Sequence, residues 1–202
     1  MVIIPGMEAL LFELTQRQIR FVVVGGLAAQ VYCSRYSTDD LDICHARDPE
    51  NLERIARLLR DLNAEWRRLP AYAPPNFDLF TLSTETDFVF NTSLGKLDLI
   101  GLVTGIGLYN EASEDAVSVE MGRQVVQTLS LPKLMCAKRS AGREKDFALL
   151  AQLEGIYGKV DALQSAHPLE CQFPPLPAMT SLSVSAVEPS HPLMMTEVRE
   201  AV

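Results

Sequence analysis

The stretch FVVVGGLAAQVYCSRYSTDDLDIC, residues 21–44, decides the fold of this chain. Its four leading apolar residues predict a short buried strand. Gly25 and Gly26 end that strand where the backbone needs an unusual dihedral or a close approach. The next residues, 27–32, predict a short helix whose N-terminal amides can face an anion. The order is therefore strand, glycine turn, helix.

The end of the same stretch alternates acidic and aliphatic residues over positions 38–43. Side chains two residues apart share one face of a strand, so Asp40 and Asp42 point one way and the aliphatic residues the other. Neighbouring carboxylates repel each other unless a cation or a proton lies between them. A strand with one buried face and one acidic face therefore predicts a metal site in a cleft.

The composition limits the class of protein. The chain has 202 residues, 48% of them hydrophobic, and a formal net charge of −8. This length predicts one domain with a real core, and the acidity argues against a protein that coats nucleic acid. No apolar run approaches the ~20 residues that cross a bilayer, and no secretory signal is evident. The four cysteines form no CxxC pair, so we expect reduced thiols, a cytoplasmic location and no membrane partner.

The remaining pattern predicts an α+β domain, with a central mixed sheet flanked by helices. Helices are expected over residues 5–19, 49–62, 130–140 and from 143 onward, strands over 77–82, 86–91 and 96–102, and a hairpin over 117–121 and 124–129. Residues 64–76 are expected to form a loop with Arg67 and Arg68 on an exposed rim, and 101–107 a flexible loop. His45 is expected on a surface loop.

Asp98 is the best candidate for a third carboxylate. It lies in the middle of the predicted strand 96–102, opposite Leu97 and Leu99. An aspartate is disfavoured in a strand interior, so a bound metal is a physical reason for its presence. Asp78 and Asp87 are weaker candidates, expected at strand ends or in solvent.

A basic segment follows on this acidic chain. Six basic residues and one acidic residue lie between positions 123 and 145. Such a local basic face suits a nucleoside triphosphate or an RNA end, and a solvated helix face is the alternative.

These residues together resemble the polymerase-β-type nucleotidyltransferase superfamily, and within it the small bacterial proteins grouped with the AbiEii toxins. The resemblance rests on Gly25-Gly26, on Asp40-Leu41-Asp42 with Asp98, and on the segment around Lys138, Arg143 and Asp146. It covers roughly residues 15–160. One departure is that many members have Gly-Ser where this chain has Gly25-Gly26.

The resemblance implies a nucleotidyltransferase-type sheet with a C-terminal helix pair, and transfer of a nucleoside monophosphate from a nucleoside triphosphate to an acceptor hydroxyl. It implies that Asp40, Asp42 and Asp98 bind Mg²⁺, with Mn²⁺ as an alternative, and are catalytic. Gly25, Gly26, Lys138, Arg143 and Asp146 would bind the nucleotide. Expected partners are the triphosphate, an acceptor that is RNA, tRNA, a protein or a small molecule, and a cognate antitoxin or toxin protein.

Two other classes remain open at this point. One is a protein of the same fold that binds a nucleotide or a partner without catalysis, and the other is a structural Cys/His metal protein. The expected organisation is a nucleotidyltransferase core over residues 1–129, a helical segment packed on it over 130–164, and a Pro/Ser-rich disordered tail over 165–202.

Overall fold

The computed structural model describes residues 3–33, 37–68 and 77–164. Within these ranges the helices are α1 (Pro5–Gln16), α2 (Gly25–Tyr32), α3 (Pro49–Asp61), α4 (Leu79–Thr84), α5 (Tyr109–Ser113), α6 (Leu131–Ala141) and α7 (Glu144–Gln164). The strands are β1 (Phe21–Val23), β2 (Asp40–His45), β3 (Glu65–Trp66), β4 (Asp87–Thr92), β5 (Gly95–Ile100), β6 (Val117–Met121) and β7 (Gln124–Thr128).

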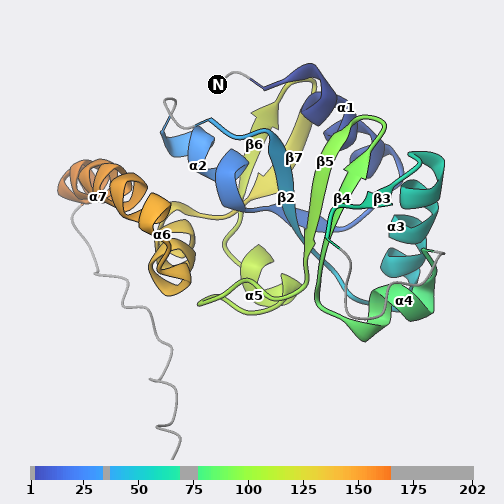
Figure 1. The fold of residues 1–202 in the computed structure, drawn as a ribbon. Helices are drawn as coiled ribbons and strands as arrows, with labels where there is room; N and C mark the ends of the chain where they lie inside the picture. Colours follow the sequence, from blue (N-terminus) through green and yellow to red (C-terminus); the bar gives the residue numbers. More distant parts are fainter. Residues whose placement is uncertain (1–2, 34–36, 69–76, 165–202) are drawn as a thin grey trace, which may run out of the picture. The chain divides into compact units, whose positions relative to one another are not determined.

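The strands form one mixed sheet in the order β3-β4-β5-β2-β1-β7-β6 (Figure 1). The pairs β2–β5 and β1–β7 are parallel, and the other neighbours are antiparallel. β1 lies between β2 and β7, and Val23 is the register partner of Thr128, far along the chain. The predicted mixed sheet flanked by helices is confirmed.

The core lies under the aliphatic face of β2 and β5. Leu41, Ile43, Leu97 and Leu99 are all fully buried, as the alternation predicts. Helix α1 packs across β2, β5 and β7, while α2 and α5 contact strands at the centre of the sheet. Because aliphatic side chains fill one face, Asp40, Asp42 and Asp98 are left on the other.

Local capping explains where the predicted helices begin and end. The Asp48 side chain accepts a hydrogen bond from the Asn51 amide at 3.2 Å and starts α3. Ser130 caps α6 in the same way. Gly142 ends α6 with a φ of +59°, a left-handed conformation that glycine adopts without steric cost.

Three expectations differ from the structure. Residues 79–84 form helix α4 and not part of a strand, because the Asp78 carboxylate accepts a hydrogen bond from the Thr81 amide at 2.8 Å and caps a helix. Strand β3 lies inside the predicted loop 64–76, of which 69–76 fall outside the described residues. The predicted flexible loop after β5 closes through a β-bridge between Val103 and Gly107. The sequence predicts residues 101–107 to be irregular throughout, so this bridge and the two differences above are local.

Helix α6 packs against α2 and against α7 (Figure 1). The expected boundaries at residues 129 and 164 stay predictions, and the tail 165–202 lies outside the described residues. Cys33, Cys44 and Cys136 are buried free thiols, as expected. Among the described helices, none has both the length and the apolar content to cross a membrane.

Candidate active site

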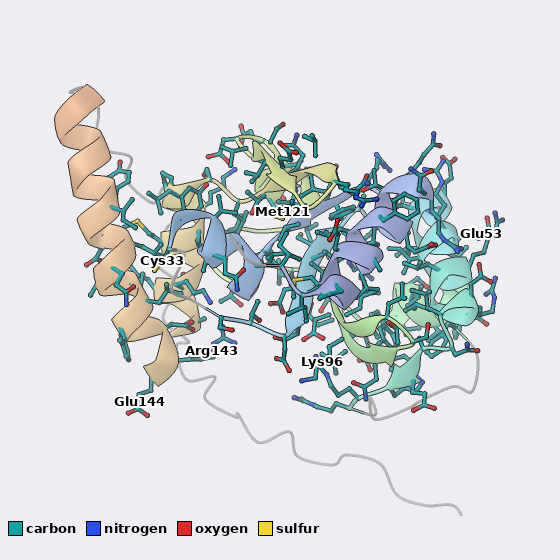
Figure 2. The ribbon with its side chains drawn as sticks, turned by 90° about the horizontal axis from the view of Figure 1, so that it is seen from above. Cys33, Glu53, Lys96, Met121, Arg143 and Glu144 are labelled. Atoms are coloured by element: carbon teal, nitrogen blue, oxygen red, sulfur yellow. The ribbon has the colours of Figure 1, made fainter. Side chains whose placement is uncertain are left out.

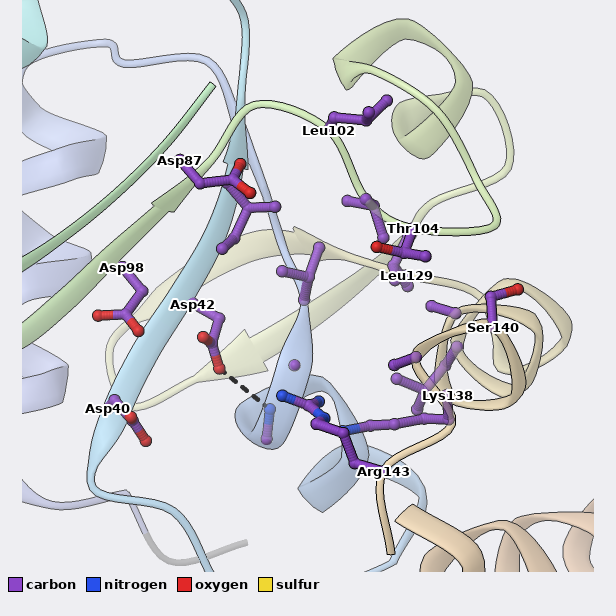
Figure 3. A pocket seen from close by; sticks show the side chains of 18 of the residues that line it. Asp40, Asp42, Asp87, Asp98, Leu102, Thr104, Leu129, Lys138, Ser140 and Arg143 are labelled. Atoms are coloured by element: carbon purple, nitrogen blue, oxygen red, sulfur yellow. Dashed lines mark hydrogen bonds between the residues drawn. The ribbon is translucent and has the colours of Figure 1, made fainter. Parts of the chain in front are cut away.

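A cavity of about 470 Å³ opens over the carboxylate-bearing face of β2 and β5 (Figure 3). It gathers the β1–α2 turn, three carboxylates and the junction between α6 and α7. Of the predicted site residues, the cavity is lined by Gly25, Gly26, Asp40, Asp42, Asp98, Lys138 and Arg143. Asp146 does not line it. The structure therefore brings together residues from positions 25 to 143 of the chain.

Strand register places the carboxylates side by side. Asp42 is the register partner of Asp98 across the parallel pair β2–β5, and Asp40 lies two residues earlier on β2. The Thr38 hydroxyl donates a hydrogen bond of 2.8 Å to Asp40 Oδ1, which fixes that carboxylate. All three acidic side chains face the same cavity.

The side chains of Asp42 and Thr38 lie so close to Gly25 and Gly26 that neither position has room for a Cβ atom. The Gly26 amide donates to Asp42 Oδ2 at 3.3 Å, and Gly25 has a φ of +61°. A Cβ at Gly25 would lie 2.1 Å from Asp42 Oδ2, and one at Gly26 would lie 2.7 Å from Thr38 Oγ1. The glycine at position 26 thus has a steric reason in this chain.

Burial and mutual repulsion favour protonation of two of the carboxylates. The pKa of Asp98 is raised to about 6, chiefly by burial; the charges of Asp42 and Asp40 contribute to this rise, and Arg67 opposes it. Burial also raises the pKa of Asp42, against the hydrogen bond from the Gly26 amide, and Asp40 adds to the rise. This cluster costs folding energy when it is ionised, which is typical of a site built to hold a cation.

Arg67 is a residue of this site that the sequence analysis placed on an exposed rim. Its guanidinium Nη2 forms an ion pair with Asp98, and its Nη1 lies 3.5 Å from Asp40 Oδ2. The Arg67 amide donates to the Val89 carbonyl at 3.0 Å, and Val89 is the register partner of Asp98. Arg67, Val89, Asp98 and Asp42 therefore form one row across the sheet.

The orientation of Arg67 follows from its neighbour. Trp66 packs among Phe77, Phe88 and Phe90, with ring centroids 4.8–5.8 Å from its own. Because successive side chains on a strand alternate, burying Trp66 on the core face turns Arg67 toward the carboxylates.

Lys138, Arg143 and Asp146 form an ion cluster at the α6–α7 junction, in which Lys138 and Asp146 are buried and Arg143 is exposed. Asp146 accepts from Lys138 Nζ at 2.9 Å and from Arg143 Nε at 2.8 Å. Burial alone would raise the pKa of Asp146, but these two hydrogen bonds hold it below its usual value. Asp146 thereby positions two cations that line the cavity on the side of the glycine turn (Figure 3).

Lys96 lies on the carboxylate face of β5, and on the same side of the molecule as Arg143 in the view of Figure 2. Its amine pairs with the exposed Asp39 at 2.5 Å.

The far wall of the cavity is apolar and is formed by Ile100, Leu102, Val103, Leu129, Leu134 and Ala137. Asp87 also lines the cavity, at the start of β4.

His45 is not on a surface loop. It ends β2 with no exposed surface, and neither ring nitrogen has a hydrogen-bond partner of normal geometry. Burial lowers its pKa to about 4, so the imidazole is neutral near pH 7. It belongs to the core and does not line the cavity.

The donor set fits a hard divalent cation. Asp40, Asp42 and Asp98 supply carboxylate oxygens, which Mg²⁺ and Mn²⁺ prefer, and the Arg67 guanidinium already stands between two of them as a cation. In the described ranges, however, no three His, Cys, Asp or Glu side chains stand in a metal-holding arrangement. The carboxylates suit the metal chemically, and Arg67 pairs with two of them, Asp40 and Asp98.

No protein-family description matches this sequence, and no curated protein matches it. Among solved structures, the lincosamide antibiotic adenylyltransferase LnuA, with lincomycin bound, has a TM-score of 0.53, 12% identity, and coverage of 77% of this chain and 98% of its own. ANT(2″)-Ia in complex with adenylyl-2″-tobramycin has a TM-score of 0.48 at 13% identity, covering 78% and 94%. A putative nucleotidyltransferase from Thermotoga maritima has a TM-score of 0.42 at 16% identity, covering 79% and 91%. At such identities only the fold is shared, and the LnuA match carries it. This chain has the fold of a nucleotidyltransferase.

Proposed function

We propose that this protein is a metal-dependent nucleotidyltransferase that moves a nucleoside monophosphate from a nucleoside triphosphate to an acceptor hydroxyl and releases pyrophosphate. The observation that carries the proposal is the single cavity in which three carboxylates from β2 and β5 face the Gly25-Gly26 turn and the cations of the α6–α7 junction. The fold shared with LnuA supports the same reading.

The chain's own residues have distinct roles in this proposal. Asp40, Asp42 and Asp98 hold Mg²⁺ or Mn²⁺, and a bound divalent ion would activate the acceptor hydroxyl and stabilise the charge on the leaving group. The Gly25-Gly26 turn lets the backbone approach the phosphates. Lys138 and Arg143 neutralise phosphate charge from the opposite side, and Asp146 positions both.

The proposal defines the acceptor by its chemical group. It carries a hydroxyl and belongs to RNA, tRNA, a protein or a small molecule such as an antibiotic. The apolar wall around Leu102 offers a surface for a base or for an apolar part of the acceptor. A cytoplasmic role as an AbiEii-like toxin with a cognate antitoxin rests on the resemblance of the sequence motifs.

A specific observation favours a second candidate function. Arg67 pairs with Asp98 and Asp40, and the described residues contain no ready metal-holding group. A protein of this fold that binds a nucleotide or a partner without catalysis would have the same features. The experiment below separates the two.

The test is label transfer from each α-³²P-labelled nucleoside triphosphate, with Mg²⁺ or Mn²⁺, into total RNA and into a protein lysate. We expect label with the native protein and none with Asp40→Ala or with Asp40→Ala/Asp42→Ala. Asp39→Ala is the matched control, because Asp39 is next to Asp40 in the sequence but its side chain is 71% exposed and does not line the cavity. Triphosphate binding without label under every condition, by a folded native protein, would favour the non-catalytic candidate.

A further inference from the structure

We propose that Arg67 is a displaceable counter-ion, which holds Asp40 and Asp98 together when no divalent metal is bound and leaves them when a metal binds. This inference rests on the proposed function, because it needs the three carboxylates to be the metal site. It adds that the free protein keeps its own cation in that site and that metal must compete with it.

The geometry shows why the two cations exclude each other. One guanidinium contacts carboxylates from two strands, Asp98 on β5 and Asp40 on β2. A metal held by these carboxylates would need the same oxygen atoms and the space between them.

Exposure indicates that the Arg67 side chain is able to leave. The side chains of Arg67 and Asp40 are 25% and 34% exposed, so water can replace that contact, whereas Asp98 is 12% exposed and needs the incoming metal as its new partner. The Lys138–Asp146 pair is different, with side chains only 5% and 1% exposed. Removing the cation from that pair would take an ammonium away from a carboxylate that water does not reach, whereas Arg67 can move into solvent.

The backbone of Arg67 is fixed while its side chain moves. The hydrogen bond to Val89 and the packing of Trp66 hold the end of β3 in the sheet. The displacement is therefore a rotation of one long side chain, with no change of the sheet. Such a side chain can stay near the cavity mouth after it leaves the carboxylates.

The test measures Mn²⁺ binding without nucleotide, from the electron paramagnetic resonance signal of free Mn²⁺. We expect Arg67→Gln to bind Mn²⁺ roughly fivefold more tightly than the native protein, because a partly exposed ion pair no longer competes. Arg68→Gln is the matched control: it removes the same charge from the adjacent, exposed residue, and its affinity should stay native. In EDTA, Arg67→Gln should melt at a lower temperature than native protein, and Mg²⁺ should raise its melting temperature more.

Equal or weaker Mn²⁺ affinity in Arg67→Gln would overturn the inference while leaving the proposed metal site intact. No Mn²⁺ binding by either folded protein would overturn the metal site and the proposed function with it. If Arg67→Gln does not fold, Arg67→Lys takes its place, because a lysine keeps the charge but cannot bridge two carboxylates as a guanidinium does. Its Mn²⁺ affinity should exceed the native value, and an unchanged affinity would count against the inference.

Discussion

Replacing Gly25 by alanine tests whether this position needs glycine to avoid a clash with Asp42, in addition to its left-handed backbone conformation. Gly25 has a φ of +61°, and a Cβ there would lie 2.1 Å from Asp42 Oδ2, 2.6 Å from Cγ and 2.8 Å from Cβ. The clash reaches the stem of the side chain, so a rotation of the carboxylate alone does not relieve it. We expect Asp42 to shift away and lose its hydrogen bond from the Gly26 amide.

The magnitude follows from a comparison with Gly142→Ala. Gly142 has nearly the same φ, +59°, but the nearest atom to an added Cβ is the Arg139 carbonyl oxygen at 3.9 Å. Both variants carry the left-handed strain of about 1 kcal/mol and the same entropic change in the unfolded chain. Gly25→Ala additionally loses a hydrogen bond to a carboxylate, which adds about 1–2 kcal/mol.

The assay is urea denaturation of native protein and of both variants at pH 7. We expect Gly142→Ala to lower the free energy of unfolding by about 1 kcal/mol and Gly25→Ala by about 2–3 kcal/mol. Label transfer by Gly25→Ala should fall sharply because Asp42 is displaced. Equal losses of stability in the two variants would refute the steric argument.

Three further predictions concern buried charges. Asp98 has a folded pKa of about 6, above its unfolded value, so its stabilising contribution is complete at low pH and is lost as the pH rises through 6. Asp98→Asn should lack this loss and be more stable than native protein at pH 8 by about 1–3 kcal/mol. A stability difference in urea denaturation that does not change with pH would contradict this. His45 has a folded pKa of about 4, below its unfolded value, so its stabilising contribution is present above pH 6.5 and is lost as the pH falls toward 4. His45→Leu should therefore reduce the fall in melting temperature between pH 6.5 and pH 4. An unchanged fall would show that the imidazole is not buried in its neutral form. Asp146→Ala removes the buried carboxylate that pairs with Lys138 and should cost about 3–5 kcal/mol, whereas Glu154→Ala in an exposed pair should cost under about 1 kcal/mol. Similar costs in chemical denaturation would argue against a strong buried ion pair.

The carboxylate face of the sheet was predictable because it depends on a local rule. Alternation along β2 and β5 places Asp40, Asp42 and Asp98 on one face whatever the rest of the chain does. That the two strands are neighbours, with Asp42 opposite Asp98, is a tertiary fact that the alternation alone did not predict.

Arg67 was missed because its segment was read as a loop. A weak signal was present: the aromatic Trp66 is followed by the polar Arg67, as the aromatic and aliphatic residues alternate at Phe88, Val89 and Phe90. A two-residue strand is too short for a periodicity, so only the pairing with β4 reveals the face on which Arg67 lies.

Two local errors have plain causes. Residues 79–84 contain aromatic and β-branched side chains, which favour strands, but the cap at Asp78 decides for a helix. His45 follows an acidic strand and precedes a charged segment, so its polarity suggested exposure. Its position at the end of a central strand buries it instead.

The place of β1 in the sheet has a consequence for synthesis. Its pairing with β7 joins residues 105 positions apart, where the Thr128 hydroxyl donates to the Val23 carbonyl. At a ribosomal rate of about 5–20 residues per second, one edge of β1 waits for roughly 5–20 seconds before its partner emerges. During that interval a nascent chain exposes an apolar strand with unpaired backbone groups, a template for aggregation. Fragments that end before Gln124 should keep this open edge permanently and be recovered in the insoluble fraction.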